Sequence, residues 1–170
     1  MNKYDVIIIG AGPSGIFCAY EFMRQKPDMK VLMIEKGRSI EKRQCPKRTT
    51  KVCVGKPCSI TTGFAGAGAF SDGKLSLSPD VGGTLPEILG YEKAEELIRE
   101  ADNIYLKFGA DEKVYGIDDY EAIERIRAKA IRANLKLIEC PIRHLGTEEG
   151  YKIYTRLQEH LLASGVEIKF

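Results

Sequence analysis

The stretch DVIIIGAGPSGIFCAYEF, residues 5–22, decides the fold of this chain. The β-branched run Tyr4–Ile9 predicts a strand that is buried on both faces. From Pro13 to Gln25 apolar residues recur at helical spacing, which predicts a helix. Its buried face is expected to consist of Ile16, Ala19, Tyr20 and Met23. The run KVLMIE, Lys30–Glu35, predicts a second strand, so the whole is a βαβ unit with neighbouring parallel strands.

A glycine motif, G-x-G-x-x-G, joins the first strand to the helix and is filled by Gly10, Gly12 and Gly15. In dinucleotide-binding proteins these glycines permit a tight turn, a close approach to a pyrophosphate, and packing of the helix on the strand. The helix N-terminus adds N–H groups and a partial positive charge. Glu35, 20 residues after Gly15, is the acid expected to accept hydrogen bonds from a ribose. A free carboxylate there favours FAD or NAD over NADP.

Composition and charge argue against several other classes. The chain has 170 residues, one domain's worth, with 44% hydrophobic and 29% charged residues and a net charge of +2. This balance gives no reason to expect nucleic acid, no apolar run is long enough to cross a bilayer, and the N-terminus lacks a signal-peptide layout. Five cysteines fit no secreted disulfide framework. We expect a cytoplasmic protein with a small-molecule substrate, without nucleic-acid or membrane partners; its oligomeric state is left open.

Residues 36–90 interrupt the α/β pattern. They are rich in Gly, Pro, Ser, Thr and Lys, and so long an irregular segment usually has a functional cause. Beyond it we expect helices at Glu92–Phe108, from a cap at Asp118 or Asp119 to about Arg132, and within Thr147–Ser164, and strands at 135–140 and 166–170. The second of these helices carries an apolar stripe of Ile123, Ile126 and Ala130. The predicted fold class is α/β, a Rossmann-like domain with three layers around a parallel sheet.

The expected domain boundaries follow from this pattern. Residues 1–40 and 135–170 form the core of the Rossmann-like domain, and residues 41–134 are an inserted glycine-rich loop and helical region. The chain ends at Phe170, inside a third expected strand, so the doubly wound sheet is incomplete. We therefore expect the N-terminal fragment of a longer enzyme, which by itself holds a dinucleotide weakly or not at all.

Two regions carry a family resemblance. DVIIIGAGPSG followed by VLMIEKG, within residues 5–37, resembles the opening of the FAD-dependent oxidoreductases with a glutathione-reductase-like flavin domain. GFAGAGAFSDGKLSLSP, residues 63–79, and CPIRHLGT, residues 140–147, are similar to stretches of the uncharacterised FAD-dependent, or NAD-utilising, dehydrogenases. The resemblance implies FAD as cofactor, hydride or electron transfer through the flavin, and NAD(H) or NADP(H) as candidate electron donors.

The resemblance also implies which residues hold the cofactor. The glycine motif would bind the FAD pyrophosphate, Glu35 the adenosine ribose, and segment 69–74 the flavin side, unless that segment is only a flexible lid. Lys36 or Arg43 would meet the adenosine or pyrophosphate, although basic runs are more often solvated surface. Lys74 would stabilise the anionic reduced ring. The predicted cofactor-binding residues are Gly10, Ala11, Gly12, Pro13, Ser14, Gly15, Glu35, Lys36, Arg43, Ala69, Phe70, Ser71, Asp72, Gly73 and Lys74; no catalytic residue or metal ligand is assigned.

Cysteines and histidines leave alternatives open. Cys53 and Cys58, in CVGKPC, have a spacing that resembles the redox disulfide of flavin disulfide reductases, but their flanking residues depart from that family's pattern. With Cys45 they would form a metal or iron–sulfur site only if further ligands joined them; otherwise they are reduced thiols. Cys18 is expected in the core, and His144 is a candidate proton donor or flavin contact. A non-catalytic dinucleotide-binding module is the alternative to an enzyme.

Overall fold

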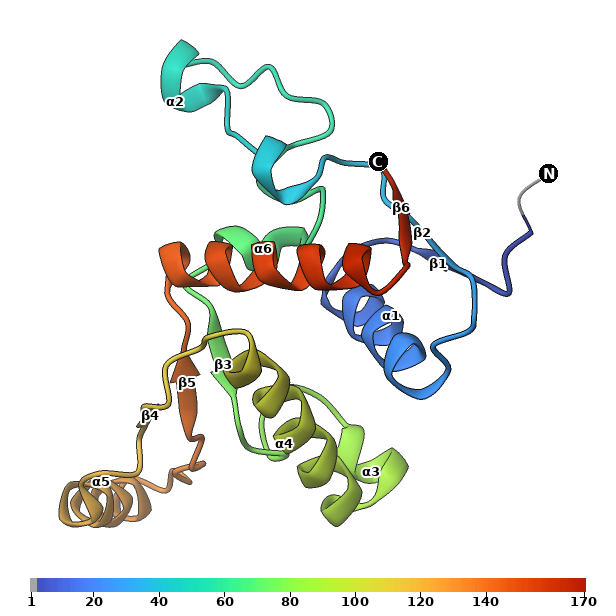
Figure 1. The fold of residues 1–170 in the computed structure, drawn as a ribbon. Helices are drawn as coiled ribbons and strands as arrows, with labels where there is room; N and C mark the ends of the chain where they lie inside the picture. Colours follow the sequence, from blue (N-terminus) through green and yellow to red (C-terminus); the bar gives the residue numbers. More distant parts are fainter. Residues whose placement is uncertain (1–2) are drawn as a thin grey trace. The chain divides into compact units, whose positions relative to one another are not determined.

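The computed structural model describes residues 3–170, which form two compact units. Unit 1 consists of the described residues up to Gly73 together with Gly146–Phe170, and unit 2 is Lys74–Leu145. Figure 1 labels their helices and strands. Unit 1 contains β1 (Val6–Ile9), α1 (Pro13–Gln25), β2 (Val31–Ile34), η1 (Ile40–Lys42), α2 (Lys47–Thr50), η2 (Gly66–Phe70), α6 (Thr147–Ala163) and β6 (Glu167–Lys169). Unit 2 contains β3 (Lys74–Ser76), α3 (Leu85–Leu89), α4 (Tyr91–Lys107), β4 (Val114–Tyr115), α5 (Tyr120–Arg132) and β5 (Ile142–His144).

The sheet of unit 1 is parallel, with strand order β1-β2-β6. Val6 pairs with Val31, and Leu32 pairs with Glu167 on the other side of β2. Parallel neighbours need a crossover connection, and α1 supplies it between β1 and β2. Helix α1 packs on both strands and also contacts α6. The predicted α/β, Rossmann-like fold is therefore confirmed, with a parallel sheet of three strands in the described part of unit 1.

Only one face of this sheet is well packed at β1. Ile8 pairs with Met33, and both are buried on the face that carries α1. The helix buries the four residues expected of it: Ile16, Ala19, Tyr20 and Met23. Ile7 and Ile9 point to the opposite face, because side chains alternate along a strand, and they are 57% and 78% exposed. The expectation that β1 is buried on both faces is wrong, because α1 and α6 leave these two residues uncovered.

The segment 41–73 belongs to unit 1. Arg38 forms a β-bridge with Gly63, the Phe64 N–H donates to the Arg38 carbonyl oxygen at 3.0 Å, and the Phe64 side chain is fully buried. Residues 135–145 lie in unit 2. The boundaries of the compact units therefore differ from those of the expected domains. The irregular segment belongs to unit 1 because its backbone pairs with residues that follow β2, and composition does not reveal such pairing.

Unit 2 contains an antiparallel sheet in the order β3-β5-β4. The strand predicted at 135–140 is wrong, because those residues are irregular and the strand forms after Pro141, at β5. Leu135 and Ile138 are 66% and 42% exposed. These two apolar side chains therefore contribute to no buried face.

Helix α5 forms where it was predicted but lies on the surface of unit 2. The Asp119 carboxylate caps it by accepting a hydrogen bond from the Ala122 N–H at 2.8 Å. None of its residues is fully buried: of the predicted apolar stripe, Ile123 and Ala130 are half-buried and Ile126 is 53% exposed. The predicted helices of α1, α4 and α6 are confirmed. Among residues 3–170, no helix is both long and apolar enough to cross a membrane.

An ion pair holds β5 to α4. Arg143 is 4% exposed, and its Nε and Nη2 donate to Oδ1 and Oδ2 of Asp102 at 2.5 and 2.8 Å. Its Nη1 donates to the Asp111 carbonyl oxygen at 2.5 Å. Hydrogen bonding to Asp102 raises the pKa of the Arg143 guanidinium. The pair is bidentate and largely removed from water, so loss of one partner leaves the other charge buried and uncompensated.

Asp102→Ala is expected to lower the free energy of unfolding of unit 2 by about 3 kcal/mol, because Arg143 would stay buried without its partner. Lys93→Ala breaks an exposed pair with Glu96 on the same helix and should cost less than about 1 kcal/mol. Amide hydrogen exchange of β5 measures both effects. Equal protection factors in the two variants would contradict a structural role for the Arg143 pair.

Candidate functional site

The three glycines of the turn after β1 have different roles. Gly10 has a φ of +98°, which disfavours any residue with a side chain. A Cβ at Gly15 would lie 2.0 Å from the Gly10 carbonyl oxygen, so only glycine lets α1 approach the turn this closely. A Cβ at Gly12 would meet nothing within 4 Å. The chain itself does not need a glycine at position 12, and the open space there lets a ligand reach the backbone.

The N-terminus of α1 lies at this open space. Gly12 is the N-cap of the helix, and no side chain caps it. Pro13 occupies the first turn, where a missing N–H leaves nothing unpaired. The 13-residue helix therefore presents uncapped N–H groups and a partial positive charge. This arrangement suits a pyrophosphate, and it lies at the carboxyl end of β1, where open parallel sheets bind ligands.

The Glu35 carboxylate lies directly after β2 and connects two parts of the site. Its Oε2 accepts a hydrogen bond from the Ala11 N–H at 2.9 Å, and its Oε1 accepts one from the Gly37 N–H at 2.8 Å. The residue is 8% exposed. A carboxylate has about four acceptor positions, so each oxygen can accept a further hydrogen bond from a ribose hydroxyl. The predicted acid is thus beside the glycine turn.

The glycine-rich segment that contains η2 packs against the same turn. The Ala65 N–H donates to the Ala11 carbonyl oxygen at 2.7 Å. A Cβ at Gly66 would lie 3.7 Å from the Gly12 Cα. The structure therefore brings together the glycine motif, Glu35 and residues 65–66, which precede the segment 69–74 predicted to face the flavin.

Arg43 holds this segment in place. Its guanidinium donates to four carbonyl oxygens, those of Ser59 at 2.9 Å, Ile60 at 2.7 Å, Phe64 at 2.6 Å and Gly66 at 2.7 Å. Arg43 is 3% exposed, and burial lowers the pKa of its guanidinium, while the charges of Glu35 and Cys58 oppose this shift. Contact between Arg43 and a cofactor stays a prediction; its role in the fold is to fix the loop.

The other predicted cofactor residues divide between the two units. In unit 1 the exposed side chains among them are Ser14, Lys36, Ser71 and Asp72. Ala69 is buried, and the Phe70 ring lies 4.7 Å from the Arg43 guanidinium carbon. Lys74 begins β3 of unit 2, where it pairs with His144. The roles of these residues toward a flavin stay predictions.

Two further glycines shape the site and were not predicted. A Cβ at Gly37 would lie 2.4 Å from the Gly63 backbone nitrogen, and a Cβ at Gly63 would lie 2.6 Å from the Arg38 carbonyl oxygen. Gly63 also has a φ of +124°. A glycine two residues after Glu35 is a sequence signal that could have indicated this close approach.

All five cysteines are free thiols. Cys18 is exposed, so its expected place in the core is wrong, because it lies outside the buried face of α1. Cys53 and Cys58 are also exposed. Backbone hydrogen bonds from Ile60 and Thr61 lower the pKa of the Cys58 thiol, which favours a reactive thiolate, and a redox role for the pair stays a prediction. Residues 3–170 contain no group of three or more His, Cys, Asp or Glu side chains placed to hold a metal ion.

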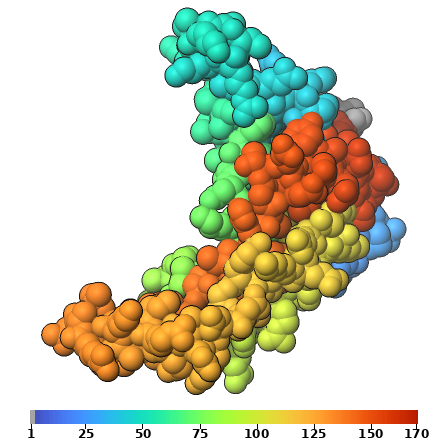
Figure 2. Space-filling view, turned by 90° about the vertical axis from the view of Figure 1, so that its left-hand side faces the viewer, coloured from blue at the N-terminus to red at the C-terminus, as the bar shows by residue number. Residues whose placement is uncertain are grey.

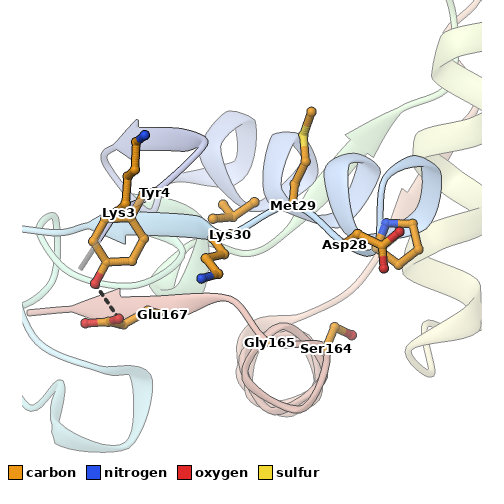
Figure 3. Close-up of a pocket in the computed structure, with 10 residues that line it drawn as sticks. Lys3, Tyr4, Asp28, Met29, Lys30, Ser164, Gly165 and Glu167 are labelled. Carbon is orange, nitrogen blue, oxygen red and sulfur yellow. Dashed lines mark hydrogen bonds between the residues drawn. The ribbon is translucent and has the colours of Figure 1, made fainter. Parts of the chain in front are cut away.

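A cavity of about 380 Å³ lies at the other end of the sheet, before β1 and β2 begin (Figure 3). Its lining includes Lys30 and Ser164, and the Tyr4 hydroxyl donates to Oε2 of Glu167 at 2.5 Å within it. Because ligands of open parallel sheets bind at the carboxyl ends of the strands, this cavity is not a candidate for the dinucleotide.

The fold and the glycine turn together define a Rossmann-like unit. Residues 1–41 match the model of the Thi4 family. A stretch of 33 residues, 19% of this chain, is 48% identical to the thiamine thiazole synthase of Coprinopsis cinerea and covers 10% of that protein. The L-amino acid deaminase of Proteus myxofaciens, solved in complex with anthranilate, is 16% identical with a TM-score of 0.43. That match covers 99% of this chain and 38% of the deaminase, so each of the two matches covers less than half of the relative's length.

Gly15→Ala is expected to destabilise unit 1 by about 2 kcal/mol, because the new Cβ would collide with the Gly10 carbonyl oxygen and displace α1. Gly150→Ala, in α6, is the matched control, because a Cβ there meets nothing within 4 Å. It should leave the stability unchanged or raise it by up to about 1 kcal/mol, because alanine is the better helix former. Urea unfolding followed by circular dichroism measures both, and coincident midpoints would refute the close approach.

Arg43→Lys is expected to destabilise the loop by about 2 kcal/mol, because a lysine cannot reach four carbonyl oxygens at once. The amides of Phe64 and Ala65 should then exchange faster with solvent. Arg48→Lys, an exposed change on α2, should leave these exchange rates unaltered. Unchanged protection of Phe64 in Arg43→Lys would show that the loop does not depend on the guanidinium.

Proposed function

We propose that unit 1 binds FAD at the turn after β1 and that the protein is an FAD-dependent oxidoreductase. The observation that carries this proposal is the open space at Gly12, in front of an uncapped helix N-terminus. The match of residues 1–41 to the Thi4 family and the local identity with a thiamine thiazole synthase support an enzyme that begins with such a turn.

The residues around the turn fit the two polar parts of the cofactor. Backbone N–H groups at the start of α1 would bind the pyrophosphate, and Ser14 would add a hydroxyl from an exposed position. Glu35 would accept hydrogen bonds from the adenosine ribose while it keeps its bonds to Ala11 and Gly37. The backbone thus supplies the phosphate site and one carboxylate supplies the sugar site.

The flavin side of the proposal involves residues 69–74, which begin with the last two residues of η2. Because Ala65 and Gly66 lie against the glycine turn, residues 69–74 continue from a point close to the cofactor, with Lys74 as the cation for the reduced ring. When bound, FAD would supply hydride or electron transfer. NAD(H) or NADP(H) as donor, a small-molecule substrate and a cytoplasmic location are parts of the same proposal.

Gly12→Ala tests the cofactor site separately from the fold. We expect the variant to fold normally, because its Cβ meets open space, and to bind FAD about tenfold or more weakly, because the methyl group would keep the pyrophosphate from the backbone N–H groups. Titration of the full-length protein with FAD, followed by flavin fluorescence, measures the affinity. Gly150→Ala is again the control and should bind FAD like the unchanged protein.

An affinity for FAD that Gly12→Ala leaves intact would overturn the proposed site. Reduction of the bound flavin is the second readout, measured as loss of its visible absorbance after NADH or NADPH is added. Binding without reduction by either donor would favour a non-catalytic dinucleotide-binding module.

A further inference from the structure

A second cavity, of about 390 Å³, begins directly beyond Glu35, between the end of β2 and the loop that follows α2. Lys36 and Arg38 line it from the β2 side, and Lys56 lines it from the loop. An amide and two hydroxyl groups complete its polar surface: Gln44, Ser59 and Thr62. No carboxylate lines this cavity in the described part of the chain.

The three cations of this cavity form no ion pair in the described part of the chain. All three side chains are exposed, and none takes part in any of the ion pairs formed within residues 3–170. The acidic groups nearby are already engaged. Glu35 accepts from two backbone N–H groups, and Glu41 accepts from Ser39 and Gln158. A concave surface lined by one sign of charge concentrates the field and attracts an anion.

The wall of the cavity is held in shape by the contacts of the candidate site. Gly37 packs against the Gly63 backbone, and Arg43 binds the carbonyl oxygen of Ser59 at 2.9 Å. The Thr62 N–H donates to the Cys58 carbonyl oxygen at 2.9 Å. Most residues of the segment 44–58, coloured cyan to green-blue, are exposed, and Figure 2 shows this segment at the surface, so a ligand can reach this part of unit 1.

We propose that this cavity binds a phosphate group, separately from the pyrophosphate site at the glycine turn. A phosphate monoester carries close to two negative charges at neutral pH and three acceptor oxygens. Three cations more than balance that charge, the cations and two hydroxyl groups offer donors for all three oxygens, and an arginine is suited to a bidentate contact with phosphate. A volume of about 390 Å³ admits the phosphate and part of the molecule that carries it.

The phosphate belongs to a ligand other than FAD. Both phosphates of FAD form its pyrophosphate, which the proposed function places at Gly12, whereas this cavity lies on the far side of Glu35. Two sources share the required chemistry: free inorganic phosphate, and the phosphate ester of a second nucleotide, such as the 2′-phosphate of NADP(H). The proposal needs no flavin, so it can be tested whether or not FAD binds.

The test compares two variants that each remove two positive charges. Arg38→Gln with Lys56→Gln removes them from the cavity, and Lys129→Gln with Arg132→Gln removes them from the exposed face of α5 in unit 2. The probes are inorganic phosphate, NADPH and NADH, titrated into the chain by calorimetry at low ionic strength. The cavity variant should bind phosphate about tenfold more weakly, and the α5 variant should change by less than about twofold, because its two charges do not line the cavity. Arg38→Lys, which keeps the charge, should retain most of the affinity.

The three probes distinguish the source of the phosphate. NADPH binding at least about tenfold tighter than NADH, with the difference lost in the cavity variant, would assign the site to a phosphorylated nucleotide. Binding of inorganic phosphate, with NADPH no better than NADH, would assign it to the free anion. Absence of phosphate-dependent binding, or equal weakening by the two double variants, would overturn the proposal.

Discussion

The close approach of α1 to the turn after β1 is the constraint on which the rest of unit 1 depends. The Gly10 carbonyl oxygen occupies the space that a Cβ of residue 15 would need, so the turn and the helix have one relative position. The Gly10 N–H donates to the Ile34 carbonyl oxygen at 2.7 Å, which fixes β2 against the same turn. As a result, Gly12 lies at the uncapped N-terminus of α1, and the contacts of α1 with the turn and of the turn with β2 fix the orientation of this helix end. Backbone geometry alone builds a site for an anion there, without a charged side chain.

Glu35 and Arg43 extend this constraint into a segment without regular structure. Glu35 joins Ala11 to Gly37, and Arg43 gathers four carbonyl oxygens of the loop 59–66. Both charges are compensated chiefly by backbone dipoles, whose N–H and C=O groups would otherwise need partners of their own. A buried, fully satisfied polar network specifies one arrangement of the groups that it joins. The loop therefore has a defined shape although its sequence has little periodicity.

The parts of the structure that could be predicted are those determined by local pattern. Helix α1 begins and ends where its apolar spacing places it, and Glu35 follows β2 at the expected distance, because strand, turn and helix are neighbours in the sequence. The apolar run LKLIEC at 135–140 is not a strand, since a short apolar run does not reveal whether a partner strand is present. The structural role of Arg43, which donates hydrogen bonds to four carbonyl oxygens of the loop, could not be recognised among the basic residues around it. Its partners lie 16 to 23 residues further along the sequence, and only the folded loop shows that they are close to Arg43.

The end of β2 carries two kinds of charge within four residues, and this order has a consequence for ligand choice. Glu35 is an acceptor with 8% exposure, suited to hydroxyl groups and repulsive to a phosphate. Lys36 and Arg38 follow it and line a cavity without acids. Arg43, further along the same basic run, is committed to the loop and contributes its charge to the fold rather than to the cavity. A sugar hydroxyl and a phosphate would thus be sorted into adjacent sites of opposite sign, because the same turn of chain that buries the carboxylate exposes the cations.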